Sequence, residues 1–336
     1  MTDDWDDLEA VPEEDLWFLP GPMEDDVPPG APPLPVADRR AIFDSAEWRG
    51  AQDTLSGELA HLTQIFGELD SRLRRAPKGM RLRLALREAA DLSWWTGDRL
   101  TSDRLALWIG LRIGSTEDSE QALARAGWTA RRLSGGPAPT EGFGAFFERD
   151  GDDQSAVPDL AEVLASVEDL HPVVQAAVGF FAWRILGTER AREGEAAVLA
   201  ARLAAGMSRA PGQGALFLPL AMTGPGTFRG QGEPPRKLAM WIAGAEQATL
   251  AALMDLDRLE EWRARADVAT NDLSGRTPAL LLDVFESWPH VTAPLAEAET
   301  HASRAAMQRN LDRLTERGVI REVTGQGRYR VWVASS

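Results

Sequence analysis

The chain has 336 residues, of which 44% are hydrophobic and 26% are charged, and it contains no cysteine. This length and apolar fraction predict a globular protein of two domains, or of one large domain with an appendage. The absence of thiols excludes disulfides, thiolate metal sites and cysteine nucleophiles. The four histidines are scattered along the sequence, so we expect neither a metal site nor another cofactor.

The sequence also lacks the signals of secretion and membrane insertion. It begins with acidic residues, whereas a secretory signal begins with basic ones. No unbroken run of hydrophobic residues, the run 196–201 included, exceeds six residues, far short of the ~20 residues that cross a bilayer. We therefore expect a soluble cytoplasmic protein that does not contact membranes.

The net charge of −16 is distributed unevenly. Residues 1–38 hold twelve acidic residues and no basic one, which leaves only −4 for the rest of the chain. Residues 301–336 carry seven arginines and three acidic residues. Because the local field governs attraction to a polyanion, the acidic whole-chain balance does not exclude DNA binding.

Residues 1–38 also contain eight of the 21 prolines. A segment this charged and this rich in proline cannot bury enough apolar surface to offset its conformational entropy, so it is predicted to be a disordered arm. The apolar tetrad 16–19 interrupts its polarity. The tetrad either docks on the body or on a protein partner, or remains solvated.

Residues 39–270 are predicted to form an all-α body. Apolar residues recur at helical spacing over 55–73 and 82–93, and no long stretch alternates with period two. Residues 172–187 are strongly apolar, which predicts a buried central helix.

Two connections rich in Gly and Pro are expected in the body, at 135–158 and 210–236. The glycines of the second connection lack the Gly-Lys-Ser/Thr ending of a phosphate-binding loop. Residues 236–269 are predicted to form either one long helix or a broken helical hairpin. Its apolar stripe comprises Leu238, Trp241, Ala245, Ala248, Ala252, Leu256, Leu259 and Trp262.

Residues 275–336 are predicted to form a separate domain that begins with three helices. Thr277, Thr292 and Ser303 are the expected N-caps, because Thr and Ser side chains accept hydrogen bonds from the free amides of a first helical turn. Pro278 follows the first cap, and proline is favoured at the start of a helix.

The third helix and the residues after it complete the pattern. Met307, Leu311 and Leu314 share one helical face, and Gly318 stands where a left-handed C-cap belongs. Residues 319–333 contain two runs of β-forming residues around a glycine-rich turn, which predicts a β-hairpin. Three helices followed by a hairpin is the order of a winged helix-turn-helix, so the predicted fold is a mostly α protein with this domain at its C-terminus.

The exposed face of the third helix predicts DNA binding. Arg304 and Gln308, with Arg309 or Asn310, would enter the major groove, where Arg reads guanine and Gln or Asn reads adenine. Arginines further along the helix and in the wing would contact phosphates. The predicted DNA-contacting residues are Ser303, Arg304, Ala306, Gln308, Arg309, Arg313, Arg317, Gln326, Arg328 and Arg330.

The sequence therefore favours a transcriptional regulator that binds double-stranded DNA and is not an enzyme. In this interpretation the body supplies a dimerisation surface or a surface for a ligand or partner, and the acidic arm competes with DNA for the basic tail. Winged helices also bind proteins, so the alternative is a non-catalytic interaction scaffold. An enzyme of unrecognised chemistry is a third possibility, although no residue cluster favours it.

The segments 302–311 and 324–332 resemble the helix-turn-helix domain of an uncharacterised bacterial family, in which it follows a large helical domain of unknown function. The resemblance extends over residues 40 to 336. It implies an architecture and a DNA-binding tail, and it implies no catalytic activity.

The body is also similar in layout to Fic-domain proteins. Residues 86–93, followed by Gly97, resemble the helix that carries an inhibitory Glu in those proteins, although Thr96 occupies the Glu position here. Residues 172–185 resemble the helix that leads into the Fic active-site loop. The following residues 186–194 contain no His, no Asn and no Gly-x-Gly nest. We therefore expect a degenerate Fic-like bundle and do not expect nucleotidyl transfer.

Overall fold

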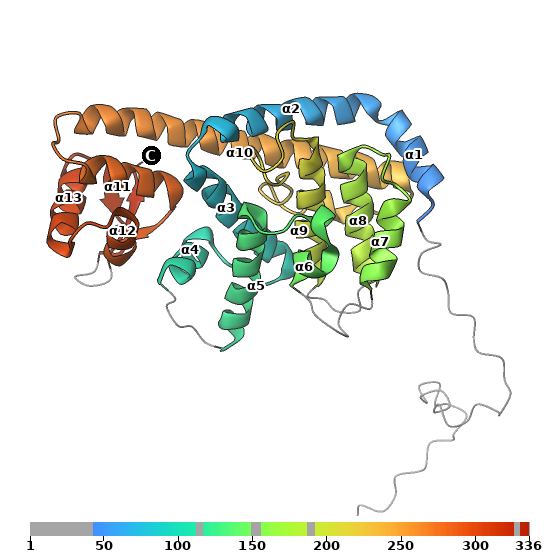
Figure 1. The fold of residues 1–336 in the computed structure, drawn as a ribbon, viewed down its shortest axis with the longest axis horizontal. Coiled ribbons are helices and arrows are strands. Elements are labelled where there is room, and N and C mark those ends of the chain that lie inside the picture. The colour runs from blue at the N-terminus through green and yellow to red at the C-terminus, as the bar shows by residue number, and fades with distance from the viewer. Residues whose placement is uncertain (1–42, 112–116, 149–155, 187–191, 326–329, 336) are drawn as a thin grey trace, which may run out of the picture. The chain divides into compact units, whose positions relative to one another are not determined.

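A computed structural model describes residues 43–111, 117–148, 156–186, 192–325 and 330–335 (Figure 1). These residues are mostly helical, as predicted. By their contacts, the described residues all belong to one compact unit. The predicted acidic arm, with its apolar tetrad, lies outside the described residues.

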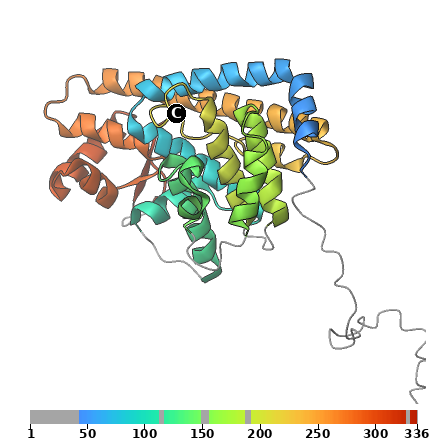
Figure 2. The same cartoon turned by 45° about the vertical axis from the view of Figure 1, so that its right-hand side comes forward.

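The longest element is α10 (Pro234–Thr270), an unbroken helix of 37 residues. The structure thus resolves the two predicted alternatives in favour of one long helix. Every residue of its predicted apolar stripe is buried. Helices α1 (Ser45–Thr54) and α2 (Ser56–Arg75) pack along it (Figure 2).

The centre of the body is α8 (Pro172–Leu186), which packs against α7 (Val157–Ala165) and α9 (Arg192–Ala204). Most of its residues are buried, so the predicted central helix is confirmed. Phe180 and Phe181 contact Trp241 of α10, with ring centroids 5.1 and 6.3 Å apart. These aromatic contacts join α8 to the long helix.

Helix α3 (Lys78–Thr96) packs against α5 (Glu117–Ser134) and ends at Gly97, whose φ of 92° is the left-handed conformation that favours glycine. Helix α4 (Ser102–Leu111) follows. The Ser93 hydroxyl accepts a hydrogen bond from the Leu100 amide at 2.8 Å. This bond fixes the connection between α3 and α4.

Both predicted connections contain more structure than expected. The first includes η4 (Pro139–Glu141) and α6 (Phe143–Phe147), whose five residues are too few to show helical periodicity. The second, 210–236, includes η7 (Thr227–Arg229), and most of its apolar stretch is buried. There the Glu88 carboxyl accepts hydrogen bonds from the amides of Leu220 and Ala221, at 2.8 and 2.9 Å.

The C-terminal segment contains α11 (Thr277–Ser287), β1 (Val291–Thr292), α12 (Ala293–Thr300), α13 (Arg304–Glu316), β2 (Ile320–Glu322) and β3 (Val331–Ala334). The strands form an antiparallel sheet in the order β1-β3-β2, with Val291 opposite Trp332 and Arg321 opposite Val333. Strand β1 was not predicted, because two residues carry no detectable period.

The predicted caps are confirmed at two of three positions. The hydroxyl of Thr292 accepts from the Leu295 amide at 3.3 Å, and that of Ser303 accepts from the Ala306 amide at 3.4 Å. Thr277 was expected to be a cap but is the first helical residue of α11, and the cap position is occupied by Arg276.

The C-terminal segment is fixed to the body by polar contacts. The Trp262 indole N–H of α10 donates to the Val319 carbonyl at 2.9 Å. Arg263 of α10 forms ion pairs with Asp283 and Glu286 of α11, at 2.7 and 2.9 Å. The predicted domains 39–270 and 275–336 therefore lie within the same compact unit.

Candidate functional site

Helix α13 presents one buried and one exposed face. Met307, Leu311 and Leu314 are fully buried, as their spacing predicted. On other faces of the helix the side chains of Arg304, Arg309 and Arg313 are exposed. Ser303 caps the helix start, and the following Ala306 is half-buried.

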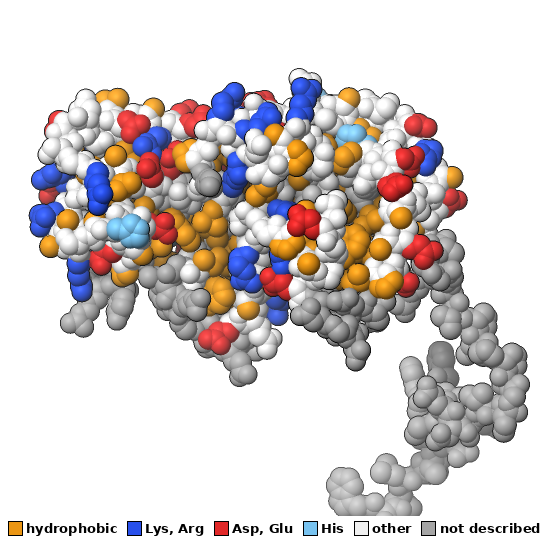
Figure 3. Space-filling view, in the orientation of Figure 1, with side chains coloured by type: hydrophobic (Ala, Val, Ile, Leu, Met, Phe, Trp, Pro, Cys, Tyr) orange, Lys and Arg blue, Asp and Glu red, His pale blue; other side chains and the backbone are white. Residues whose placement is uncertain are grey.

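Three guanidinium groups on α13 are free of ion pairs within the described part of the chain: those of Arg304, Arg309 and Arg313. Figure 3 shows basic side chains along the outer edge of the C-terminal elements. Each of these cations therefore keeps its charge and its five donors for a partner outside the described chain.

Gln308 is turned toward its own helix. Its Nε2 donates to Asp312 Oδ1 at 2.8 Å. The same oxygen lies 3.6 Å from Arg330 Nη1, and the Arg330 guanidinium lies over the Trp332 ring at 4.8 Å from its centroid. Asp312 thus links α13 to β3 and occupies donors of two predicted DNA-contacting residues.

Arg317 is committed to the body. Its guanidinium pairs with both carboxylate oxygens of Asp272 and donates to the Ala269 carbonyl at 2.6 Å. This pairing lowers the pKa of Asp272 to about 2. Arg317 joins the end of α13 to the end of α10, and its charge is already neutralised.

Two predicted contact residues, Gln326 and Arg328, lie outside the described residues. At the start of their turn the Glu322 carboxylate accepts from the Thr324 and Gly325 amides, at 2.7 and 3.1 Å. The hydrogen bond from the Thr324 hydroxyl, together with those from the two amides, lowers the pKa of Glu322. The carboxylate organises the first residues of the turn.

The structure adds two polar residues that the sequence reasoning missed. Asp312 lies four residues after Gln308, a spacing that places both on one helical face and could have revealed the contact. Arg321 is exposed on β2. Its orientation depends on the strand register, which the sequence did not determine.

Two segments for which the sequence predicts a Fic-like layout lie close together at one point. A Cβ atom on Gly194, near the start of α9, would lie 3.7 Å from the Thr96 methyl at the end of α3. Residues 187–191 of the intervening connection lie outside the described residues. Their predicted lack of catalytic chemistry remains a prediction from sequence.

No protein-family model matches the chain, and no curated protein matches it. Within the described ranges, no three His, Asp or Glu side chains gather in an arrangement that could hold a metal ion. None of the helices described combines the length and the apolar character needed to cross a bilayer.

Proposed function

We propose that the chain is a transcriptional regulator that binds double-stranded DNA through residues 275–336, folded as a winged helix-turn-helix. The element order supports this assignment: helix, short strand, helix, helix and two antiparallel strands. In this architecture α13 is the recognition helix and the turn between β2 and β3 is the wing.

The observation that carries the proposal is the division of α13 into two faces. Met307, Leu311 and Leu314 are completely buried, while three arginines are exposed without ion-pair partners among the described residues. An α-helix fits the major groove of B-DNA. Arg304, Gln308 and Arg309, in the first half of α13, are the candidates to contact base edges.

Phosphate contacts would come from Arg313 and Arg330, which lie further along α13 and beside the wing. Arg317 does not belong to this set, because Asp272 and Ala269 already bind its guanidinium. Gln326 and Arg328 are retained in the proposal from their sequence positions alone.

Fluorescence anisotropy with the full-length chain tests the proposal. A labelled pool of random duplexes is titrated at several salt concentrations, and a selection from the same pool identifies a preferred site. We expect log affinity to fall linearly with log salt, with a slope of about −0.9 per neutralised phosphate.

Single variants connect the measurement to α13. Arg309→Ala and Arg313→Ala should each weaken binding, and loss of a phosphate contact should reduce the salt slope by about one. Arg236→Ala is the matched control. Arg236 is an exposed arginine in the first turn of α10, at the end of that helix away from the C-terminal segment. Absence of duplex binding at low salt would overturn the proposal and favour the protein-interaction alternative. Equal losses in all three variants would show that α13 is not the binding element.

A further inference from the structure

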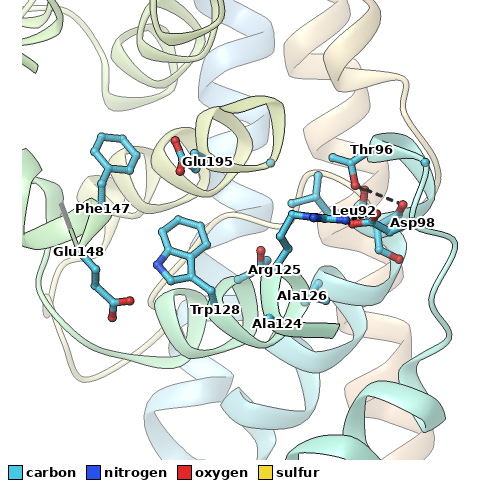
Figure 4. A pocket seen from close by; sticks show the side chains of 15 residues that line it. Leu92, Thr96, Asp98, Ala124, Arg125, Ala126, Trp128, Phe147, Glu148 and Glu195 are labelled. Atoms are coloured by element: carbon cyan, nitrogen blue, oxygen red, sulfur yellow. Dashed lines mark hydrogen bonds and ion pairs between the residues drawn. The ribbon is translucent and has the colours of Figure 1, made fainter. Parts of the chain in front are cut away.

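A cavity of about 730 Å³ opens in the body, away from the C-terminal segment. Its walls come from the end of α3, from α5, from the end of α6 and from the start of α9 (Figure 4). This volume lies within the range of small-molecule sites, which is about 300–1,000 Å³.

Much of the lining of the cavity is apolar or aromatic. Leu92, Ala126 and Phe147 line it, and the Trp128 ring projects from α5 toward Phe147, Glu148 and Glu195 (Figure 4). Aromatic and aliphatic walls of this kind bury the flat or apolar body of a ligand.

Buried residues hold the wall in place. The Trp183 ring is fully buried and stacks on Phe147 at a centroid distance of 4.4 Å, and its indole N–H donates to Glu195 at 3.1 Å. Glu148 forms an ion pair at 2.7 Å with Arg132, whose side chain is largely buried. These contacts hold the Phe147 ring and the carboxylates of Glu195 and Glu148 in place before a ligand binds.

The polar lining is rich in acceptors and poor in free donors. Arg125, the one guanidinium among the lining residues that the structure describes, is bound by both oxygens of Asp98, at 2.6 and 3.0 Å. Glu148 and Glu195 flank Trp128, and a carboxylate can accept hydrogen bonds from several donors at once. A phosphate or carboxylate ligand would meet these acidic groups, and the described residues of the lining offer it no uncommitted cation.

We propose that this cavity binds a small organic cation with a planar apolar body and an ammonium or amidinium group. The planar body packs on the Trp128 ring. The cationic group donates hydrogen bonds to Glu195 and Glu148, and the Trp128 face adds a cation–π attraction. This inference is independent of the proposed DNA binding.

Isothermal titration calorimetry with two matched probes tests it on the full-length chain. Naphthalen-2-ylmethylammonium and naphthalene-2-acetate share the same planar body and carry opposite charges. We expect the cation to bind at least about tenfold more tightly than the anion, because one changed electrostatic contact in a partly buried site has this effect.

Three variants place the binding in the cavity. Trp128→Leu removes the aromatic face, and Glu195→Gln removes a charge but keeps an acceptor for Trp183. Ala124→Phe adds bulk at an exposed lining position on α5 without deleting a contact. Each of these variants should bind the cation about tenfold more weakly than the wild-type chain does. Ala243→Phe, at an exposed site on α10 outside the cavity, should leave binding unchanged.

Circular dichroism of each variant shows whether it is folded. Because Ala124 is exposed, we expect Ala124→Phe to fold, so it still tests ligand binding if Trp128→Leu unfolds. Equal affinity for cation and anion would overturn the charge assignment. Full cation binding by Ala124→Phe, or no heat of binding by the wild-type chain, would overturn the site. Neither result bears on duplex binding, which is measured separately.

Discussion

Replacing Glu88 by Gln should remove a large pH dependence from the stability of the protein. Glu88 is 2% exposed, and its Oε2 has no hydrogen-bond partner among the described residues. Burial raises the pKa of Glu88 from 4.5 to about 8, and the amide hydrogen bonds to its Oε1 only partly oppose this shift. The side chain is therefore a neutral carboxylic acid at pH 7.

The magnitude follows from linkage. Between the unfolded pKa of about 4.5 and the folded pKa of about 8, the folded chain retains a proton that the unfolded chain has lost, so stability falls as pH rises. At about 1.4 kcal/mol per pKa unit, the total loss reaches about 5 kcal/mol. This is an upper limit, because the interior relaxes and admits water when the charge forms.

Urea unfolding of the wild-type chain and of Glu88→Gln, from about pH 5 to about pH 9, measures this loss. Gln keeps an acceptor for the Leu220 and Ala221 amides, so the two proteins should have similar stability near pH 5. Near pH 9 the variant should be more stable by several kcal/mol. Glu58→Gln, at an exposed position on α2, should show no such divergence. A constant difference between wild type and Glu88→Gln across this range would refute the reasoning.

Three further predictions concern the C-terminal segment. Asp312→Asn should raise duplex affinity at low salt by about tenfold, because it removes a negative charge from α13 and weakens the hold on Arg330; unchanged anisotropy titrations would show that Asp312 does not compete with DNA. Arg317→Ala should weaken duplex binding less than Arg313→Ala, since Asp272 already neutralises Arg317, and the same titrations rank the two. Trp262→Phe should lower the free energy of unfolding by about 1–2 kcal/mol, because it leaves the Val319 carbonyl without its indole donor. Urea denaturation measures this change, and a value near zero would mean that water replaces the bond.

Sequence periodicity predicted the helices that bury a single apolar face along their length. The α10 stripe from Leu238 to Trp262 and the α13 face of Met307, Leu311 and Leu314 are both buried as expected. Local capping chemistry predicted Thr292 and Ser303 correctly, because an N-cap hydrogen bond involves only neighbouring residues.

Features that depend on distant residues were not predictable in this way. Strand β1 has two residues and exists through its pairing with β3. The ion pair of Arg317 depends on Asp272, which lies 45 residues away along the chain. The cavity around Trp128 was missed for the same reason, because its lining comes from four separate helices.

The continuity of α10 limits how this chain can be altered. With 37 residues the helix is about 55 Å long, and it contacts α2 along one part and holds α11 through Arg263 near its end. Each inserted residue would turn everything downstream by about 100° about the helix axis. The packing of α10 in the body therefore fixes the direction in which α13 faces. The C-terminal segment cannot be moved by insertions in α10, as it could be if a flexible linker joined it to the body.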